Sequence, residues 1–435
     1  MDITIEKLIY GGEGLAHHEG STVFVPFVLP AERVAVGAIE QKKKFVRGRV
    51  EQILQAAPER VAARCPHFGI CGGCDYQHIP YEAQLKFKAE ILRETLRRIG
   101  KIDWAGEITA HGSPPWAYRN RAQWKVRAPE NSGAEPTPEI GADGGSKLGI
   151  GYFRANSTAL CAVEDCSIIS PLLLKTLLSL RTALAAGVLP RGLREIEAFV
   201  DAADAKLLLT ATFAGFPARA AEHAETFRRR VPEIASLLFH DPSHDRMELY
   251  GPGFWEYAAG EISYRVGHFS FFQVNRFLLE ELGRQVVERE EGGRLAIDLF
   301  AGVGFFSVPL AKRFARVLAV ESNPAAARDL ETNMRGKGSI EVRSAEVEQF
   351  LKRNKERPEL LVLDPPRAGL TPESVERLGR LRPERITYVS CEPPTLARDL
   401  ALFVKAGYDC TEVHLFDLFP QTFHMETVVR LRKRG

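Results

Sequence analysis

The sequence contains no hydrophobic run long enough to cross a membrane. Its longest apolar stretch, residues 171–189, is interrupted by Lys175 and Arg181, whereas a transmembrane helix needs about 20 predominantly apolar residues. The first residues lack the basic segment followed by an apolar one that an export signal requires. We therefore expect a cytoplasmic protein with no membrane partner.

Cysteine is scarce, and neither sign of charge predominates. Seven cysteines in 435 residues are too few for a disulfide scaffold, so we expect a reducing compartment. The 58 basic and 56 acidic residues leave a net charge of +2, which by itself predicts no partner. Apolar residues make up 45% and charged residues 26%, ordinary values for a globular protein that exclude an extensively disordered or collagenous chain.

The length predicts about three domains, and the chain changes character along its sequence. The first 55 residues or so indicate five short strands with glycine turns, typical of a small barrel that binds oligonucleotides; they include residues 3–9, 22–27, 32–39 and 45–53. An apolar stripe predicts a helix over 81–100, and the Pro- and Gly-rich residues 128–146 predict a mobile loop.

Strands and helices alternate from about residue 265 onward, which predicts βαβ units and a parallel sheet. The expected strands are 295–300, 316–321, 359–364, 385–391 and 427–431, and the expected helices are 305–314, 324–334 and 395–406. Ligands of such sheets bind at the carboxyl ends of the strands.

The first third of the chain has an excess of positive charge, since residues 1–127 contain 19 Lys and Arg and 14 Asp and Glu. Its densest piece, KKKFVRGR at 42–49, either contacts a phosphate backbone and a stacked base or forms a hairpin edge protected by lysines. A second segment, YRNRAQWK at 118–125, alternates as a strand does. Its basic face either meets RNA or is a sheet face with snorkelling cations.

The first strand of the expected sheet is closed by the glycine turn DLFAGVG at 298–304. Gly302 lets the backbone approach a ligand closely, and Glu321, at the end of the second strand, suits the two hydroxyls of a ribose. The full dinucleotide fingerprint is absent, so we interpret the site as one for a nucleoside cofactor, S-adenosylmethionine fitting best. The stiff loop that follows Asp364 presents this carboxylate to the cofactor or to a substrate.

Two further segments supply candidates for nucleophilic and proton-transfer chemistry. Cys391 stands where an apolar strand meets a Pro-Pro loop and a helix start, a position that stabilises a thiolate. His424 and Glu426 lie two apart at a loop-to-strand junction, so an extended segment places them on one face. One of the two is then a candidate for proton transfer.

A cysteine cluster stands apart from these motifs. Cys65, Cys71 and Cys74 form a C-x5-C-x2-C pattern, and Cys161 or Cys166 could supply a fourth thiolate. Three clustered ligands and one remote ligand fit either a [4Fe–4S] cluster or zinc.

The combination of motifs resembles the RNA uracil-5-methyltransferase family over essentially the whole chain. The motifs that carry the resemblance are YGGEGLA (10–16), SFFQVN (270–275), DLFAGVG (298–304), DPPRAG (364–369), SCEPPTLARD (390–399) and FPQTFHMET (419–427). The resemblance implies an α/β fold in three parts. These are an OB-like TRAM β-barrel (1–56), a central α+β domain with a metal cluster (57–264) and a class I, Rossmann-like methyltransferase domain (265–435).

The resemblance also implies roles for individual residues. Cys391 is the nucleophile that adds to a uracil ring, and Glu426 is the base. The residues expected to bind S-adenosylmethionine, with Gly302 of the glycine turn, are Gln273, Phe300, Glu321 and Asp364. Two positions depart from the usual pattern: Glu392 replaces a common Asn, and Ala301 replaces a common Cys.

The resemblance further favours a [4Fe–4S] cluster over zinc, with Cys166 as the fourth ligand and with Cys161 and Cys410 as packing residues. An iron–sulfur cluster beside a TRAM-like front is similar to the ribosomal branch, so we expect 23S rRNA as the partner and no obligate protein partner. Uridine 54 of tRNA is the alternative substrate. The cysteine-free DPPR loop argues against an RNA cytosine-5-methyltransferase, and the presence of both Cys391 and Glu426 argues against an RNA-binding assembly factor without activity.

Overall fold

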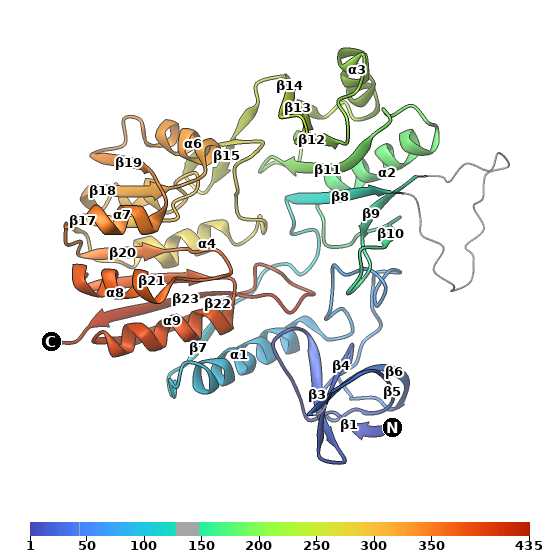
Figure 1. Cartoon of the computed structure of the whole chain (residues 1–435), viewed down its shortest axis with the longest axis horizontal. Helices are drawn as coiled ribbons and strands as arrows, with labels where there is room; N and C mark the ends of the chain where they lie inside the picture. The colour runs from blue at the N-terminus through green and yellow to red at the C-terminus, as the bar shows by residue number, and fades with distance from the viewer. Residues whose placement is uncertain (43, 128–147) are drawn as a thin grey trace. The chain divides into compact units, whose positions relative to one another are not determined.

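The computed structural model describes residues 1–42, 44–127 and 148–435. The chain divides into two compact units: residues 1–61, 78–113 and 258–435 form the first, and residues 62–77 and 114–257 form the second (Figure 1). The loop predicted at 128–146 lies outside the described residues. No helix in the described ranges has the length and apolar character that a membrane crossing requires.

The first unit begins with a six-stranded sheet in the order β1-β5-β6-β4-β3-β2. Its strands are β1 (Asp2–Thr4), β2 (Lys7–Leu8), β3 (Glu13–His18), β4 (Ser21–Pro26), β5 (Arg33–Gln41) and β6 (Phe45–Gln55). A small core of mainly valine and isoleucine side chains holds it together. The single strand predicted at 3–9 is two strands, because the Ile5 N–H bonds to Glu32 O and the Glu6 N–H to Leu15 O.

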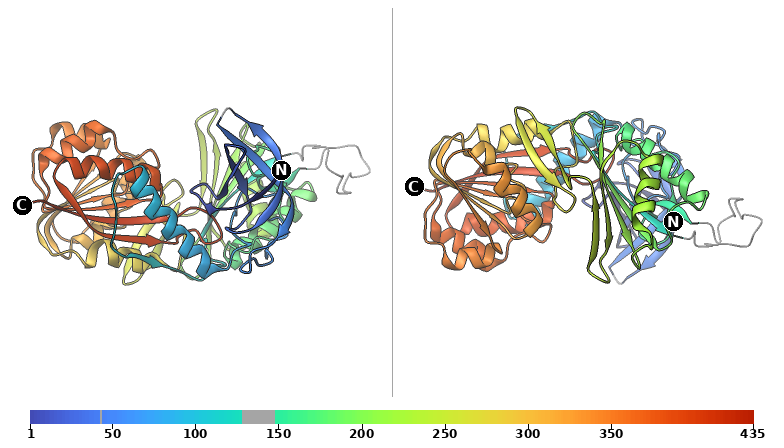
Figure 2. Two further views of the ribbon diagram at one scale, coloured as in Figure 1. Left: turned by 90° about the horizontal axis from the view of Figure 1, so that it is seen from below. Right: turned by 90° about the horizontal axis from the view of Figure 1, so that it is seen from above.

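An eight-stranded sheet dominates the rest of the first unit, in the order β19-β18-β17-β20-β21-β23-β22-β7. Its strands are β7 (Ile108–His111), β17 (Gly293–Leu299), β18 (Phe314–Glu321), β19 (Ile340–Ser344), β20 (Leu360–Leu363), β21 (Arg385–Ser390), β22 (Tyr408–Phe416) and β23 (Glu426–Lys433). Helices lie on both of its faces (Figure 2). They are α1 (Tyr81–Arg98), α4 (Leu279–Gly283), the π-helix η1 (Arg284–Glu288), α5 (Ser307–Leu310), α6 (Pro324–Met334), α7 (Val347–Arg353), α8 (Pro372–Leu381) and α9 (Pro393–Lys405).

The expectation of a parallel sheet is wrong for one strand. β19, β18, β17, β20 and β21 are parallel, but β23 runs antiparallel to both β21 and β22. The chain returns from β22 to β23 through residues 417–425 without a helix, and such a direct return produces an antiparallel pair. β7, which precedes the expected methyltransferase domain in the sequence, completes the sheet beside β22.

The strongest helix predictions agree with the structure, and one does not. α6 spans 324–334 as predicted, with the Asn323 side chain accepting hydrogen bonds from the first turn and Pro324 at its start. The helix predicted at 305–314 is only the single turn α5, because residues 311–313 form the tight turn into β18: Lys312 N–H bonds to Pro309 O and Arg313 N–H to Leu310 O.

The second unit is a seven-stranded, mostly antiparallel sheet in the order β10-β9-β8-β11-β12-β13-β14. Its strands are β8 (Arg121–Arg127), β9 (Gly149–Phe153), β10 (Leu160–Ala162), β11 (Leu193–Val200), β12 (Leu207–Phe213), β13 (Ile234–Asp241) and β14 (Arg246–Tyr250). Helices α2 (Pro171–Ala185) and α3 (Ala220–Arg230) enclose its core. A hairpin of β15 (Phe254–Ala259) and β16 (Ile262–Gly267) follows. The three-domain division at 57 and 265 stays a prediction.

Candidate active site

Most of the expected site residues lie at one edge of the eight-stranded sheet. Phe300 and Gly302 follow β17, Glu321 is the last residue of β18, Asp364 follows β20 and Cys391 follows β21. Because these strands are parallel neighbours, their carboxyl ends form one edge. The sequence correctly predicted that these motifs share a location.

Glu426 reaches the same edge because β23 is antiparallel. Ser390, the last residue of β21, pairs with Thr427 of β23, so Cys391, directly after β21, and Glu426, the first residue of β23, lie at the ends of adjacent strands. β23 begins only at Glu426, so His424 and Glu426 do not belong to the same strand. His424 lies in the preceding loop, where its N–H bonds to the Thr422 hydroxyl.

The glycine turn after β17 leaves room for a ligand. Gly302 has a φ of 55°, and a Cβ added there would meet no atom within 4 Å. Its N–H donates to Glu321 Oε2 at 2.8 Å, while Glu321 Oε1 accepts the Asn323 N–H at 2.6 Å. Each carboxylate oxygen keeps a lone pair, so Glu321 is held in place and can still accept hydrogen bonds from a ribose.

Buried carboxylates gather beside this turn. Burial raises the pKa of Asp298 to about 7, and the charge of Glu321 adds to the shift. Burial and neighbouring Asp298 likewise raise the pKa of Asp364 to about 7. Glu426 is 4% exposed, and burial and Asp364 raise its pKa well above the usual range. We call Asp298, Glu321 and Asp364 the acidic wall. A positively charged ligand bound here would offset the mutual repulsion of these carboxylates.

The Cys391 thiol is half-buried at this wall. Burial, with the charges of Glu426 and Asp364, raises its pKa to about 12, while a hydrogen bond and the positive charge of Arg367 act in the opposite direction. The thiol is therefore protonated in the free protein, and Arg367 is the neighbouring group that favours the thiolate.

The loop that carries Asp364 and Arg367 is anchored to α9, the helix that follows Cys391. The Thr395 hydroxyl donates to Arg367 O at 2.9 Å, and the Arg398 guanidinium donates to Ala368 O and Leu370 O. The Asp399 carboxylate accepts the Leu370 N–H at 2.7 Å. These bonds fix the acidic loop relative to the Cys391 segment.

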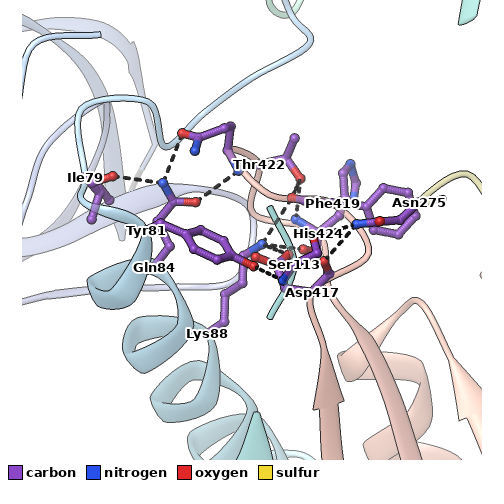
Figure 3. Close-up of polar contacts among 11 residues, drawn as sticks. Ile79, Tyr81, Gln84, Lys88, Ser113, Asn275, Asp417, Phe419, Thr422 and His424 are labelled. Atoms are coloured by element: carbon purple, nitrogen blue, oxygen red, sulfur yellow. Dashed lines mark hydrogen bonds and ion pairs between the residues drawn. The ribbon is translucent and has the colours of Figure 1, made fainter. Parts of the chain in front are cut away.

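A buried lysine holds the loop before Glu426 (Figure 3). Lys88 and Asp417 are both fully buried and form an ion pair of 2.7 Å. The Lys88 ammonium also donates to Phe419 O at 3.2 Å and to His424 O at 2.8 Å. All three donors of the ammonium are thereby used, and both ends of the loop are tied to α1.

Two amide side chains complete this anchoring. Gln84 Nε2 donates to the side-chain oxygen of Gln421, and Gln84 Oε1 accepts the Gln421 N–H, each at 3.0 Å (Figure 3). Gln421 has a φ of 70°, which a non-glycine residue adopts only when its surroundings hold it there. The Asn275 amide bonds to Asp417 O and to the Ser113 hydroxyl, and it anchors the segment that contains buried Gln273.

Sequence reasoning missed this anchoring, although a signal was present. Gln84 and Lys88 lie on the buried stripe of α1 with Ile91, Leu92 and Leu96. A lysine on an apolar stripe needs a buried partner, and its partner Asp417 is 329 residues away.

Replacing Lys88 with methionine is expected to destabilise the protein by about 3–5 kcal/mol, because Asp417 would remain buried without its partner. Urea unfolding measures the loss. The Lys88→Met/Asp417→Asn variant should lose less than Lys88→Met, and Lys86→Met, on the exposed side of α1, should change the free energy of unfolding by no more than about 0.5 kcal/mol. Equal losses for Lys86→Met and Lys88→Met would contradict the assignment.

The expected metal ligands line one cavity of the second unit. The cavity has a volume of about 60 Å³, and its walls include Cys65, Cys71, Cys74 and Cys166. Cys161 instead lies next to Cys71, to which its thiol is hydrogen-bonded. Among the described residues, no three or more His, Cys, Asp or Glu side chains are arranged to hold a metal ion.

The basic segment 118–125 leads into β8, which alternates as predicted: Ala122, Trp124 and Val126 are buried. The cations of the other face are partly neutralised by carboxylates of β11, because Lys125 pairs with Glu195 and Arg121 lies 3.7 Å from Glu197. The Arg121 guanidinium also lies over the ring of Phe199. An RNA contact for this face stays a prediction.

Comparisons with known proteins agree with this geometry. Residues 256–434 match the model of the tRNA (uracil-5-)-methyltransferase family, and residues 1–50 match the TRAM domain. An RNA methyltransferase of Aquifex aeolicus is 32% identical over 99% of this chain and 98% of its own length. The 23S rRNA (uracil(1939)-C(5))-methyltransferase RlmD of Klebsiella pneumoniae is 31% identical over 100% of this chain and 96% of its own.

A similar solved structure is that of the tRNA (uracil-54, C5)-methyltransferase of Pyrococcus abyssi in complex with S-adenosyl-L-homocysteine. The TM-score is 0.74 and the sequence identity 26%, and the match covers 99% of this chain and 100% of that chain. The shared architecture is a mixed α/β methyltransferase fold with an N-terminal TRAM β half-barrel. This chain therefore belongs to the RNA uracil-5-methyltransferase family and is an S-adenosylmethionine-dependent enzyme that methylates C5 of uracil in RNA.

Proposed function

We propose that the substrate is a uridine of 23S rRNA, with Cys391 as the nucleophile and Glu426 as the base. The roles rest on the placement of Cys391 and Glu426 at the ends of the adjacent strands β21 and β23, beside the acidic wall at the sheet edge. The observation that supports the substrate is the 31% identity, over the full chain, to a 23S rRNA enzyme.

Cys391 makes the uracil ring reactive. Uracil C5 is a poor nucleophile, and addition of the Cys391 thiolate at C6 turns the 5,6 double bond into an enolate that is electron-rich at C5. Arg367 acts on the thiol in the direction of the thiolate. The target base must leave its stack to reach this sulfur, which favours a loop or an opened helix in the RNA.

Glu426 completes the reaction. After methylation, C5 still carries its proton, and Glu426 removes it, so that β-elimination releases Cys391. The raised pKa of Glu426 makes its deprotonated carboxylate a stronger base. Its Oε1 has no hydrogen-bond partner among the described residues and is therefore free to accept the proton.

The cofactor residues fit S-adenosylmethionine, which supplies a methyl group on a positively charged sulfur. Glu321 would accept the ribose hydroxyls, and Gly302 would leave space for the nucleoside. Asp364 of the acidic wall would face the positive charge, with Phe300 and Gln273 as further contacts. Phe300, with a φ of 64°, is held at the start of the turn.

Mapping of 5-methyluridine in RNA from a strain that lacks this chain tests the substrate. We expect one methylated position of 23S rRNA to be lost and to return when the chain is supplied again. Loss of 5-methyluridine 54 from tRNA, with 23S rRNA unchanged, would overturn the proposal. The similar Pyrococcus enzyme, which acts on tRNA, gives this second outcome a specific basis.

We also propose that the cysteine cavity holds a [4Fe–4S] cluster on Cys65, Cys71, Cys74 and Cys166. Four thiols around one cavity suit a cluster that occupies space among its ligands, whereas zinc requires ligands that converge at about 2.3 Å. Methyl transfer moves no net electrons, so the role that we propose for the cluster is structural or RNA-orienting.

Anaerobically purified protein is expected to absorb near ~400 nm and to contain about four iron atoms per chain. Cys74→Ser should remove the absorbance and most of the iron, while Cys410→Ser, in β22 of the first unit, should retain both. About one zinc per chain, without absorbance in that region, would show that the iron assignment is wrong.

A further inference from the structure

Tyr10 is held in a tight turn of the TRAM half-barrel, between β2 and β3. The Ile9 N–H bonds to Glu13 O at 2.9 Å and the Gly12 N–H to Ile9 O at 3.3 Å. Gly11 and Gly12 have φ values of 107° and 83°, which explains the two glycines after Tyr10. An ion pair also links the half-barrel to α1, since Lys7 Nζ bonds to Glu94 Oε1 at 2.6 Å.

The Tyr10 side chain contacts both segments that carry the proposed catalytic residues. Its hydroxyl donates to Glu392 Oε2 at 3.0 Å, and Glu392 is bonded directly to Cys391. Its ring packs edge-to-face on Phe423, with centroids 5.4 Å apart, three residues before Glu426. Burial and the charges of Glu392 and Cys391 raise the pKa of Tyr10, so its hydroxyl stays protonated and donates.

The segment around Cys391 is so short that a single hydrogen bond can restrict its position. Only Cys391 and Glu392 connect β21 to α9. The Glu392 N–H bonds to the Ser390 hydroxyl at 3.2 Å, and Pro393 begins the helix. With the backbone restrained on both sides, the Tyr10 bond fixes the Glu392 side chain, and a hydrogen bond to a carboxylate is among the stronger ones in proteins.

We infer that Tyr10 is a positioning residue of the TRAM half-barrel, which holds the Cys391 segment through Glu392 and the Glu426 loop through Phe423. This inference rests on the proposed roles of Cys391 and Glu426. Glu392 stands where a common Asn is replaced, and in this inference it is the hydrogen-bond acceptor through which the half-barrel positions Cys391. Small displacements of a reacting group reduce rates by up to about 100-fold.

Steady-state methylation by the full chain tests this, with bulk RNA from a strain lacking the chain and S-adenosylmethionine labelled in its methyl group. Tyr10→Phe keeps the ring and removes the hydroxyl. We expect kcat to fall about tenfold, with the KM for RNA and the melting temperature unchanged. Glu392→Ala should lower kcat equally, and the double variant should lose no more than either single variant. Tyr408→Phe is the matched control, since it removes a buried hydroxyl that donates to Pro383 O, and its kcat should equal that of the wild type.

A Tyr10→Phe variant with kcat within about twofold of the wild type would overturn the inference, as would single effects that multiply in the double variant. A fall in melting temperature together with a raised KM, at unchanged kcat, would show that Tyr10 only stabilises the barrel. An active Cys391→Ala variant would instead contradict the proposed role of Cys391 itself, whatever Tyr10→Phe shows, so the two failures are distinguishable.

Discussion

Replacing Cys391 with alanine is expected to abolish methyl transfer to RNA and to lower kcat by at least about 10³–10⁴-fold. Without the sulfur adduct, the uracil ring stays a poor nucleophile at C5. The change removes one half-buried sulfur from a two-residue connection, so binding of S-adenosylmethionine and of RNA should be retained. Transfer of a labelled methyl group to RNA measures the loss, and calorimetry with S-adenosylmethionine shows that the cofactor site is intact.

Cys410→Ala is the matched control for this variant. Cys410 lies in β22, where burial and Asp409 raise the pKa of its thiol to about 11, so the two cysteines are both weakly acidic thiols and differ mainly in position. Cys410→Ala should methylate at the wild-type rate. Residual activity above about 10% in Cys391→Ala would contradict the nucleophile assignment, because an enzyme without its covalent step cannot retain it.

The sequence predicted the parts of the site that depend on neighbouring residues in the chain. A glycine turn after an apolar strand placed Gly302, and a carboxylate closing the next strand placed Glu321; both positions are correct in the structure. The start of α6 at Pro324 could be predicted in the same way, because a proline after an N-capping asparagine is a local signal for a helix start.

Contacts between distant segments could not be predicted in this way. The direction of β23 decides that Glu426 lies beside Cys391, yet a strand of alternating or continuous apolar residues carries no signal for its direction. The Lys88–Asp417 pair and the Tyr10–Glu392 bond join residues 329 and 382 positions apart. A single sequence shows only the lysine on an apolar stripe, and the unusual glutamate at position 392 emerges only from the resemblance to the family.

The pKa shifts at the site have a common cause that connects the cofactor to catalysis. Asp298, Asp364 and Glu426 are buried and Cys391 is half-buried beside them. Burial raises the pKa of each group, and neighbouring negative charges add to the shift. A cationic ligand at the acidic wall would lower the pKa of all four groups. The thiolate and the basic carboxylate would then form most readily when the cofactor is bound, which protects an otherwise reactive thiol in the free enzyme.

Replacing Glu426 with glutamine is expected to trap the enzyme on its RNA. Glutamine keeps the shape of the side chain but cannot remove the C5 proton, so addition and methylation proceed while β-elimination stops. The methylated uracil then stays bonded through C6 to Cys391, and turnover should fall by about 10²–10⁴-fold. A denaturing gel detects the adduct as a band of protein that is shifted by the RNA and that disappears after ribonuclease treatment.

Two variants show whether the trapped species comes from the assigned residues. Cys391→Ala/Glu426→Gln should form no adduct, because the sulfur that bonds to C6 is absent. Glu412→Gln, in the neighbouring strand β22 where Glu412 pairs with His414 and Arg430, should turn over normally and leave no adduct. If Glu426→Gln turned over at the wild-type rate without an adduct, another group would have to be the base. The structure favours Glu426 over His424, because the His424 ring packs against Phe419 and Phe423. Glu426 is buried next to the acidic wall and has an oxygen with no partner among the described residues.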